Sequence, residues 1–167
     1  MMKKRKIIVI DDDVDFAALM KDVLEATRRY EVLVAHDGAA GLELCRKQKP
    51  DLVYLDFIMP KMKGDEVIIF LKRDSATRDI PIIMISGLSD LPAAEKISPP
   101  GPGTPAAKTS AVSGSSKMSK DALAQSIAEQ LGVDAFLSKP FDKEKLLRFT
   151  EAFLAGGGTS GRNVRKP

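Results

Sequence analysis

Short apolar runs alternate along this chain with segments that carry the apolar periodicity of an amphipathic helix. The runs predict strands over Ile7–Ile10, Val32–Ala35, Leu52–Leu55, Ile80–Ile85 and Ala135–Leu137. The periodic segments predict helices over Val14–Leu24, Ala39–Lys47, Asp65–Arg73 and Asp142–Leu154. Regular alternation of strands and helices is typical of a parallel sheet that is covered on both faces. The sequence therefore predicts an α/β fold, a doubly wound parallel sheet of five strands.

The composition is that of a globular chain with one well-buried domain. The chain has 167 residues, of which 44% are hydrophobic and 29% charged. Its single cysteine, Cys45, excludes an internal disulfide and a multi-cysteine metal site. No apolar run approaches the roughly 20 residues that span a bilayer. The net charge of +3 is small, and no aromatic residues interleave the basic ones. We therefore expect a cytoplasmic protein that binds neither membranes nor DNA directly.

Two segments have a composition that is unsuited to a packed core. Residues 91–118 contain Pro92, Pro99, Pro100, Pro102 and Pro105 together with many Gly, Ser, Thr and Ala residues. Residues 156–167 are rich in Gly and basic residues. Such segments bury too little apolar surface to offset the entropy of ordering them. We predict one domain over residues 5–155 that is interrupted by a flexible insertion at about 91–118, with a helix resuming near Ser119, and a disordered tail over 156–167.

Polar side chains stand at the ends of four predicted strands. They are the acidic run Asp11-Asp12-Asp13, Asp56, Ser86 and Lys139. In an open parallel sheet, ligands bind outside the carboxyl ends of the strands. Carboxylates suit a hard divalent cation, while a hydroxyl and an ammonium suit the oxygens of a phosphoryl group. The sequence therefore predicts a Mg²⁺-dependent site that accepts a phosphoryl group.

Together with their neighbours, these residues resemble the receiver domain of bacterial two-component response regulators. The resemblance rests on four motifs in order: IIVIDDD at 7–13, DLVYLDFIMP at 51–60 with Gly64, PIIMISG at 81–87 and AFLSKPF at 135–141. It implies the flavodoxin-like strand order 2-1-3-4-5. Few residues follow Ala155, so we expect a receiver of the stand-alone, single-domain type.

The resemblance also implies a role for each site residue. Asp56 would be the phosphoacceptor, and Asp11 and Asp12 would hold Mg²⁺, or Mn²⁺, with Asp56 and the backbone carbonyl of Ile58. Three successive aspartates leave a register shift by one residue open, which would give Asp13 one of these roles.

The remaining roles concern the phosphoryl group and the response to it. Ser86 and Lys139 would bind phosphoryl oxygens, and Pro140 would be the cis proline of the family. Phe136 would be the switch aromatic that turns inward when Ser86 moves, with an ordinary core phenylalanine as the alternative. Ile58 and Leu88 are apolar and unable to orient an attacking water, so we expect a long-lived phosphoryl group.

The implied function is a phosphorylation-activated switch in a phosphorelay. Its donor would be a sensor histidine kinase or a phosphotransfer protein. Its output would be contact with a downstream protein through the face of the fourth helix, fifth strand and fifth helix. We expect a monomer or a phosphorylation-dependent homodimer, and no turnover enzyme.

Two alternatives remain open. The first is a phosphorylation-independent interaction module that keeps the receiver fold. The second is a haloacid-dehalogenase-like phosphohydrolase, whose Asp-x-Asp motif the run Asp11-Asp12-Asp13 mimics.

Overall fold

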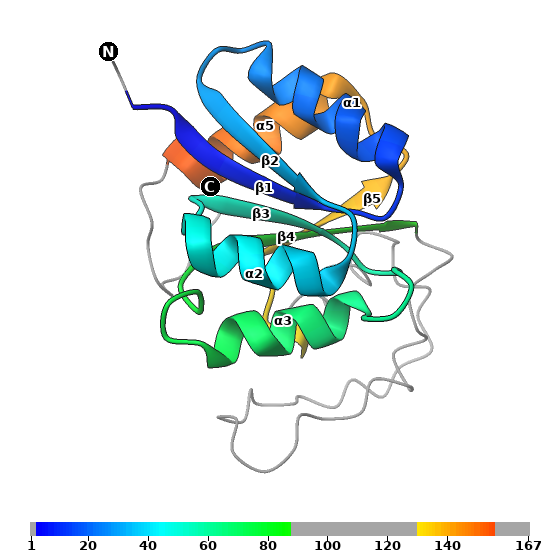
Figure 1. The fold of residues 1–167 in the computed structure, drawn as a ribbon. Helices are drawn as coiled ribbons and strands as arrows, with labels where there is room; N and C mark the ends of the chain where they lie inside the picture. Colours follow the sequence, from blue (N-terminus) through cyan, green and yellow to red (C-terminus); the bar gives the residue numbers. More distant parts are fainter. Residues whose placement is uncertain (1–2, 88–129, 156–167) are drawn as a thin grey trace, which may run out of the picture.

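Five strands form a single parallel sheet (Figure 1) in the computed structural model, which describes residues 3–87 and 130–155. The strands are β1 Arg5–Ile10, β2 Tyr30–Ala35, β3 Leu52–Asp56, β4 Ile82–Gly87 and β5 Ala135–Lys139. Their spatial order is β2-β1-β3-β4-β5, and every neighbouring pair is parallel. The predicted fold class and strand order are confirmed.

Helices cover both faces of this sheet, as Figure 1 shows. They are α1 Val14–Glu25, α2 Gly38–Gln48, α3 Gly64–Arg73 and α5 Lys143–Ala155. Helices α1 and α5 lie on one face, and α2 and α3 lie on the other. Each of these helices begins and ends within one residue of its predicted bounds. The predicted helix from near Ser119 lies mostly outside the described residues, which resume at Gln130.

Successive strand residues point to opposite faces and so build two cores. The α2/α3 core contains Ile8, Ile10, Val53, Leu55, Ile82 and Met84, with side chains from α2 and α3. The α1/α5 core contains Ile7, Val9, Leu52, Tyr54, Ile83, Ile85 and Leu137, with side chains from α1 and α5. Because the central strands are buried on both faces, their carboxyl-terminal ends are held rigidly, side by side, at one end of the sheet.

Strands β4 and β5 end later than the sequence indicated. β4 begins at Ile82, after Pro81, because proline has no N–H for the ladder. Pro81 contributes only its carbonyl, which accepts from Val53 at 3.0 Å. β4 then continues through Ser86 and Gly87, which pair with Ser138 and Lys139 of β5. Ser86 and Lys139 are therefore strand residues rather than loop residues.

The open edge of β2 is covered at Val32 by two side chains of α1. The Val32 N–H donates to the Glu25 carboxylate at 3.0 Å, and the Val32 carbonyl accepts from the Lys21 ammonium at 2.7 Å. Lys21 and Glu25 also form an ion pair at 3.4 Å. The pair occupies backbone groups that could otherwise bond another strand, which is a protection against edge-to-edge association.

The predicted insertion at 91–118 and the predicted tail at 156–167 lie outside the described residues, so the domain boundaries stay predictions. Among the helices of residues 3–87 and 130–155, none has the length and apolar character required to span a membrane.

Candidate functional site

Three carboxylates meet at the carboxyl edge of the sheet. β1 and β3 are neighbours and pair Ile10 with Leu55, so Asp11 and Asp56 emerge side by side. Oxygens of Asp11, Asp12 and Asp56 all lie within 4.8 Å of one another. Asp11 and Asp56 are buried, whereas Asp12 is exposed. The cluster thus has two shielded carboxylates and one that faces solvent.

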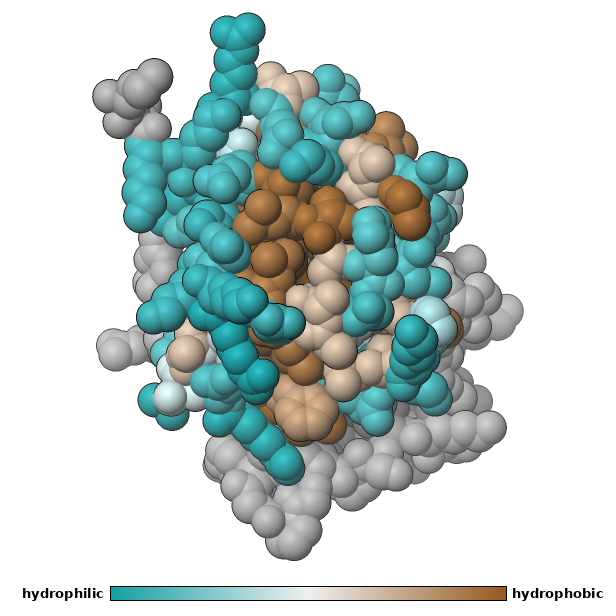
Figure 2. Space-filling model, in the orientation of Figure 1, coloured by the Kyte–Doolittle hydropathy of each residue, from teal (hydrophilic) through white to brown (hydrophobic). Residues whose placement is uncertain are grey.

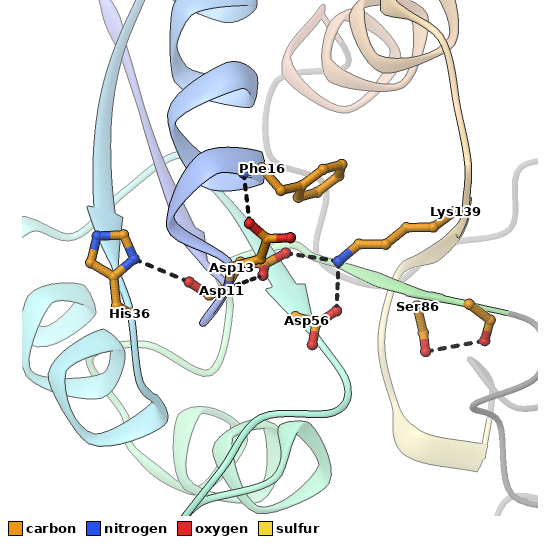
Figure 3. A network of polar contacts seen from close by, with 8 residues as sticks. Asp11, Asp13, Phe16, His36, Asp56, Ser86 and Lys139 are labelled. Atoms are coloured by element: carbon orange, nitrogen blue, oxygen red, sulfur yellow. Dashed lines mark hydrogen bonds and ion pairs between the residues drawn. The ribbon is translucent and has the colours of Figure 1, made fainter.

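The ammonium of Lys139 lies between the two buried carboxylates (Figure 3). Its Nζ donates to Asp11 Oδ2 at 3.0 Å and to Asp56 Oδ1 at 3.1 Å. Lys139 reaches this position from β5, which is separated from β3 by β4. A flexible four-carbon stem allows this reach, and the positive charge offsets part of the carboxylate repulsion.

The site perturbs both of its central titratable groups. Burial raises the pKa of the Asp56 carboxyl to about 6; Lys139 counteracts this rise, and the charges of Asp11 and Asp12 add to it. Burial opposes the charged form of Lys139, but the hydrogen bonds that the ammonium donates to Asp11 and Asp56 outweigh burial and raise the pKa of Lys139. An acidic group with such a pKa suits a role in chemistry rather than in stability.

Asp13 has a separate, structural task. Its carboxylate accepts from the Phe16 N–H at 3.0 Å and caps the N-terminus of α1. Its own N–H donates to Asp11 Oδ1 at 2.9 Å and so orients that carboxylate. Among the three successive aspartates, the geometry places Asp11 and Asp12 in the cluster with Asp56 and leaves Asp13 as the cap.

The other predicted site residues lie around this cluster. Ser86 is buried at the end of β4, and its hydroxyl donates to the Gly87 carbonyl at 3.2 Å, to one side of Asp56 (Figure 3). Phe136 is half-buried and packs against the α2/α3 core. Ile58 is exposed, two residues after Asp56. Pro140 follows a cis peptide bond with Lys139. The roles in phosphoryl binding and switching stay predictions.

Gly64 fixes the loop that follows Asp56. Its N–H donates to the Phe57 carbonyl at 2.9 Å, which closes the loop just before α3. A Cβ on Gly64 would lie 2.7 Å from the Asp56 carbonyl oxygen and 2.8 Å from Phe57 Cα. Only glycine permits this approach, so the backbone of the candidate phosphoacceptor depends on it.

Two contacts of the site carry no clear signal in the sequence. The Phe16 ring lies under the Lys139 ammonium, with Nζ 4.2 Å from the ring centroid. Phe16 belongs to the apolar stripe of α1 and so reads as a core residue. The second contact is that of His36, whose Nδ1 lies 3.2 Å from the Asp11 carbonyl oxygen (Figure 3). Neither contact could be found from spacing, because the partners are distant in the sequence.

The acidic cluster fits a Mg²⁺ ion. Its three carboxylates offer hard oxygen ligands at the mouth of a rigid sheet, and Asp12 is open to solvent. A cation, the Lys139 ammonium, already lies between Asp11 and Asp56, so positive charge suits this position. Ile58 lies in the β3–α3 loop, two residues after Asp56, so its backbone carbonyl is a candidate fourth ligand beside the three carboxylates.

Comparison with known proteins agrees with this geometry. The family model for the response regulator receiver domain matches residues 7–101. The DNA-binding dual master transcriptional regulator RpaA of Synechocystis sp. is 31% identical over 89% of this chain. A probable transcriptional regulator, ycf27 of Cyanophora paradoxa, is 30% identical over 98% of it. The chain spans 48% and 57%, respectively, of the lengths of these two relatives.

Solved structures share the fold at lower identity. Chemotaxis protein CheY4 of Vibrio cholerae superposes with a TM-score of 0.66 at 22% identity, covering 90% of this chain and 99% of that one. A CheY-like receiver domain protein of Methanospirillum hungatei gives 0.65 at 21% identity, covering 92% and 96%.

These relatives correct one expectation from the sequence. We predicted that the protein would not bind DNA directly, with contact to a downstream protein as its output. That prediction is wrong, because a relative that matches most of this chain is a DNA-binding regulator. The composition argument considered only this chain, which spans less than two thirds of that relative.

Proposed function

The chain belongs to the response regulator receiver domain family, and from this premise we propose that it is a phosphorylation-controlled switch of two-component signalling. A sensor histidine kinase or a phosphotransfer protein would donate the phosphoryl group to Asp56. The observation that carries the proposal is the position of the Asp56 carboxylate, which lies beside the Lys139 ammonium and within the acidic cluster.

The transfer step follows from the chemistry of these groups. An ionised oxygen of Asp56 attacks the phosphorus of a phosphohistidine and forms the new P–O bond. The P–N bond breaks at the same centre, and its electron pair returns to the imidazole nitrogen. The Lys139 ammonium would bind one negatively charged oxygen of the phosphoryl group. The Ser86 hydroxyl would turn away from the Gly87 carbonyl and bind another phosphoryl oxygen.

The site would hold Mg²⁺ through the carboxylates of Asp11, Asp12 and Asp56 and the backbone carbonyl of Ile58. When bound, the ion supplies positive charge for the phosphoryl oxygens and relieves the repulsion among the carboxylates. Asp13 supports this set through its N–H, which holds Asp11 Oδ1. Burial of Asp11 and Asp56 restricts water around the reacting centre.

In the proposed function the chain takes up one phosphoryl group and releases it slowly, so it is a switch rather than a turnover enzyme. Family membership favours this over a phosphohydrolase. It would act in the cytoplasm, where phosphoryl donors derived from ATP are available. A phosphorylation-independent interaction module is the alternative that the experiment below must exclude.

The relatives lead us to propose that the switch controls transcription, because RpaA and ycf27 are named as transcriptional regulators. Chromatin immunoprecipitation of the natural protein should find specific DNA sites whose occupancy changes in the Asp56→Asn variant. Equal occupancy of every site by both proteins would contradict control by this residue.

The proposal is tested by the intact mass of the chain after incubation with Mg²⁺ and acetyl phosphate. The parent should gain one phosphoryl group, and Asp56→Asn should gain none. Continued release of phosphate in excess of the protein would instead indicate a phosphohydrolase. A parent that gains nothing, although it binds Mg²⁺, would favour the phosphorylation-independent module.

A further inference from the structure

We propose that Phe16 is a positioning residue of this site, whose aromatic ring holds the Lys139 ammonium in place for phosphoryl transfer. The inference rests on the proposed function. Phe16 lies in the first turn of α1, directly after the acidic loop. Figure 3 shows its ring beside the end of the Lys139 side chain. The ring centroid lies 4.2 Å from Lys139 Nζ. This distance is well within the roughly 6 Å over which an aromatic face attracts a cation.

The Phe16 ring contacts the Lys139 ammonium on a side that the carboxylates leave open. An ammonium has three N–H donors, and hydrogen bonds to Asp11 and Asp56 engage it on one side. The Phe16 ring meets it on another side, and the Lys139 side chain keeps only 28% of its surface exposed. A lysine stem has four rotatable bonds and would otherwise extend into solvent. The ring therefore restricts Lys139 to the acidic cluster.

The ring is itself held on two sides. The Phe16 N–H donates to the capping carboxylate of Asp13, which fixes the turn that carries the ring. The ring also packs edge-to-face against Phe141, with centroids 5.6 Å apart and an interplanar angle of 76°. Phe141 follows Lys139 by two residues, so the same contact fixes the end of β5 relative to α1. The ring thus joins the acidic loop to the segment that carries the lysine.

A plain packing role is the competing explanation, because Phe16 also packs against the α1/α5 core. The two explanations differ in which property of the ring matters. Packing depends on apolar volume, whereas attraction of a cation depends on the electron density of the ring face. Phe149 offers a matched control, since it is a half-buried phenylalanine packed against the same core on α5.

The test compares initial rates of phosphorylation by acetyl phosphate with Mg²⁺ at equal protein stability. Phe16→Leu should be about fivefold slower than the parent, the effect of losing a contact worth about 1 kcal/mol. Phe16→Tyr should retain most of the parent rate. Fluorinated phenylalanines at position 16 should slow the reaction progressively as fluorines withdraw charge from the ring face. Phe149→Leu, and the same fluorinated residues at position 149, should leave the rate unchanged.

A second measurement does not depend on phosphorylation. In the nuclear magnetic resonance spectrum, the ring current should shift the ε protons of Lys139 upfield in the parent. Phe16→Leu should return them to their ordinary position, and Phe149→Leu should leave them shifted. An unshifted parent resonance would overturn the inference.

The outcomes separate this inference from the proposed function. The positioning role alone would be overturned if the parent and Phe16→Leu were phosphorylated at the same rate. It would also be overturned if fluorinated phenylalanines at position 16 left the rate of phosphorylation unchanged. A parent that takes up no phosphoryl group would overturn the proposed function and the positioning role with it.

Discussion

Replacement of Asp56 by asparagine should stabilise the fold at neutral pH when divalent cations are absent. Burial raises the pKa of the Asp56 carboxyl from 3.8 to about 6, so the folded chain binds this proton more tightly than the unfolded chain does. The free energy of unfolding therefore falls as the pH rises through this interval. At about 1.4 kcal/mol per pH unit, the ionised carboxylate destabilises the fold by up to about 3 kcal/mol at pH 7. Asparagine removes that penalty.

Urea denaturation of both proteins measures this difference. Asp56→Asn should exceed the parent by roughly 2–3 kcal/mol near pH 7 and by little near pH 4, where the parent carboxyl is protonated. Asp79→Asn serves as the control, because the Asp79 side chain is 76% exposed and should change stability little at either pH. Added Mg²⁺ should narrow the difference near pH 7. Equal stability of parent and Asp56→Asn at neutral pH without Mg²⁺ would refute the reasoning.

Three further changes test other parts of the structure. Gly64→Ala should destabilise the fold by about 1–3 kcal/mol in urea denaturation, because its Cβ would meet the Asp56 carbonyl; unchanged stability would contradict this. Glu25→Ala leaves the Val32 N–H open at the β2 edge, so sedimentation should show more concentration-dependent self-association than in the parent; equal self-association would contradict the protective role of Glu25. Ile58→Glu places a water-orienting carboxylate beside Asp56 and should shorten the half-life of the phosphorylated chain, followed by intact mass; an equal half-life would argue against a role for Ile58.

The acidic cluster and Lys139 could be anticipated because each of these residues lies at the end of a strand or directly after it, next to an apolar run that the sequence shows. In a parallel sheet the carboxyl ends of adjacent strands lie side by side, and this does not depend on the conformation of the loops. The ends of β4 and β5 were harder to predict. Ser86 and Gly87 have little strand character of their own, and they extend β4 only because β5 offers a partner. Strand pairing decided these boundaries, and pairing is not visible in local sequence.

Contacts between residues that are distant in the sequence could not be predicted from local sequence patterns. Phe16 occupies a position in the helical stripe that predicts burial in the core, and part of its ring does pack there. Its contact with Lys139 joins the start of α1 to the end of β5, two elements that are far apart in the sequence, so no short segment encodes it. The contact between His36 and the Asp11 carbonyl depends instead on the pairing of β1 with β2, in which the Asp11 N–H donates to the Ala35 carbonyl at 3.0 Å.

The measurement that tests the central claim most directly is the position of the phosphoryl group. The chain would be phosphorylated with acetyl phosphate and Mg²⁺, reduced with borohydride and digested, and its peptides sequenced by mass spectrometry. Borohydride converts an aspartyl phosphate to homoserine, so our account predicts homoserine at position 56 and aspartate at 11, 12 and 13. Homoserine at any of those three positions with aspartate retained at 56, or no homoserine in a phosphorylated chain, would contradict it.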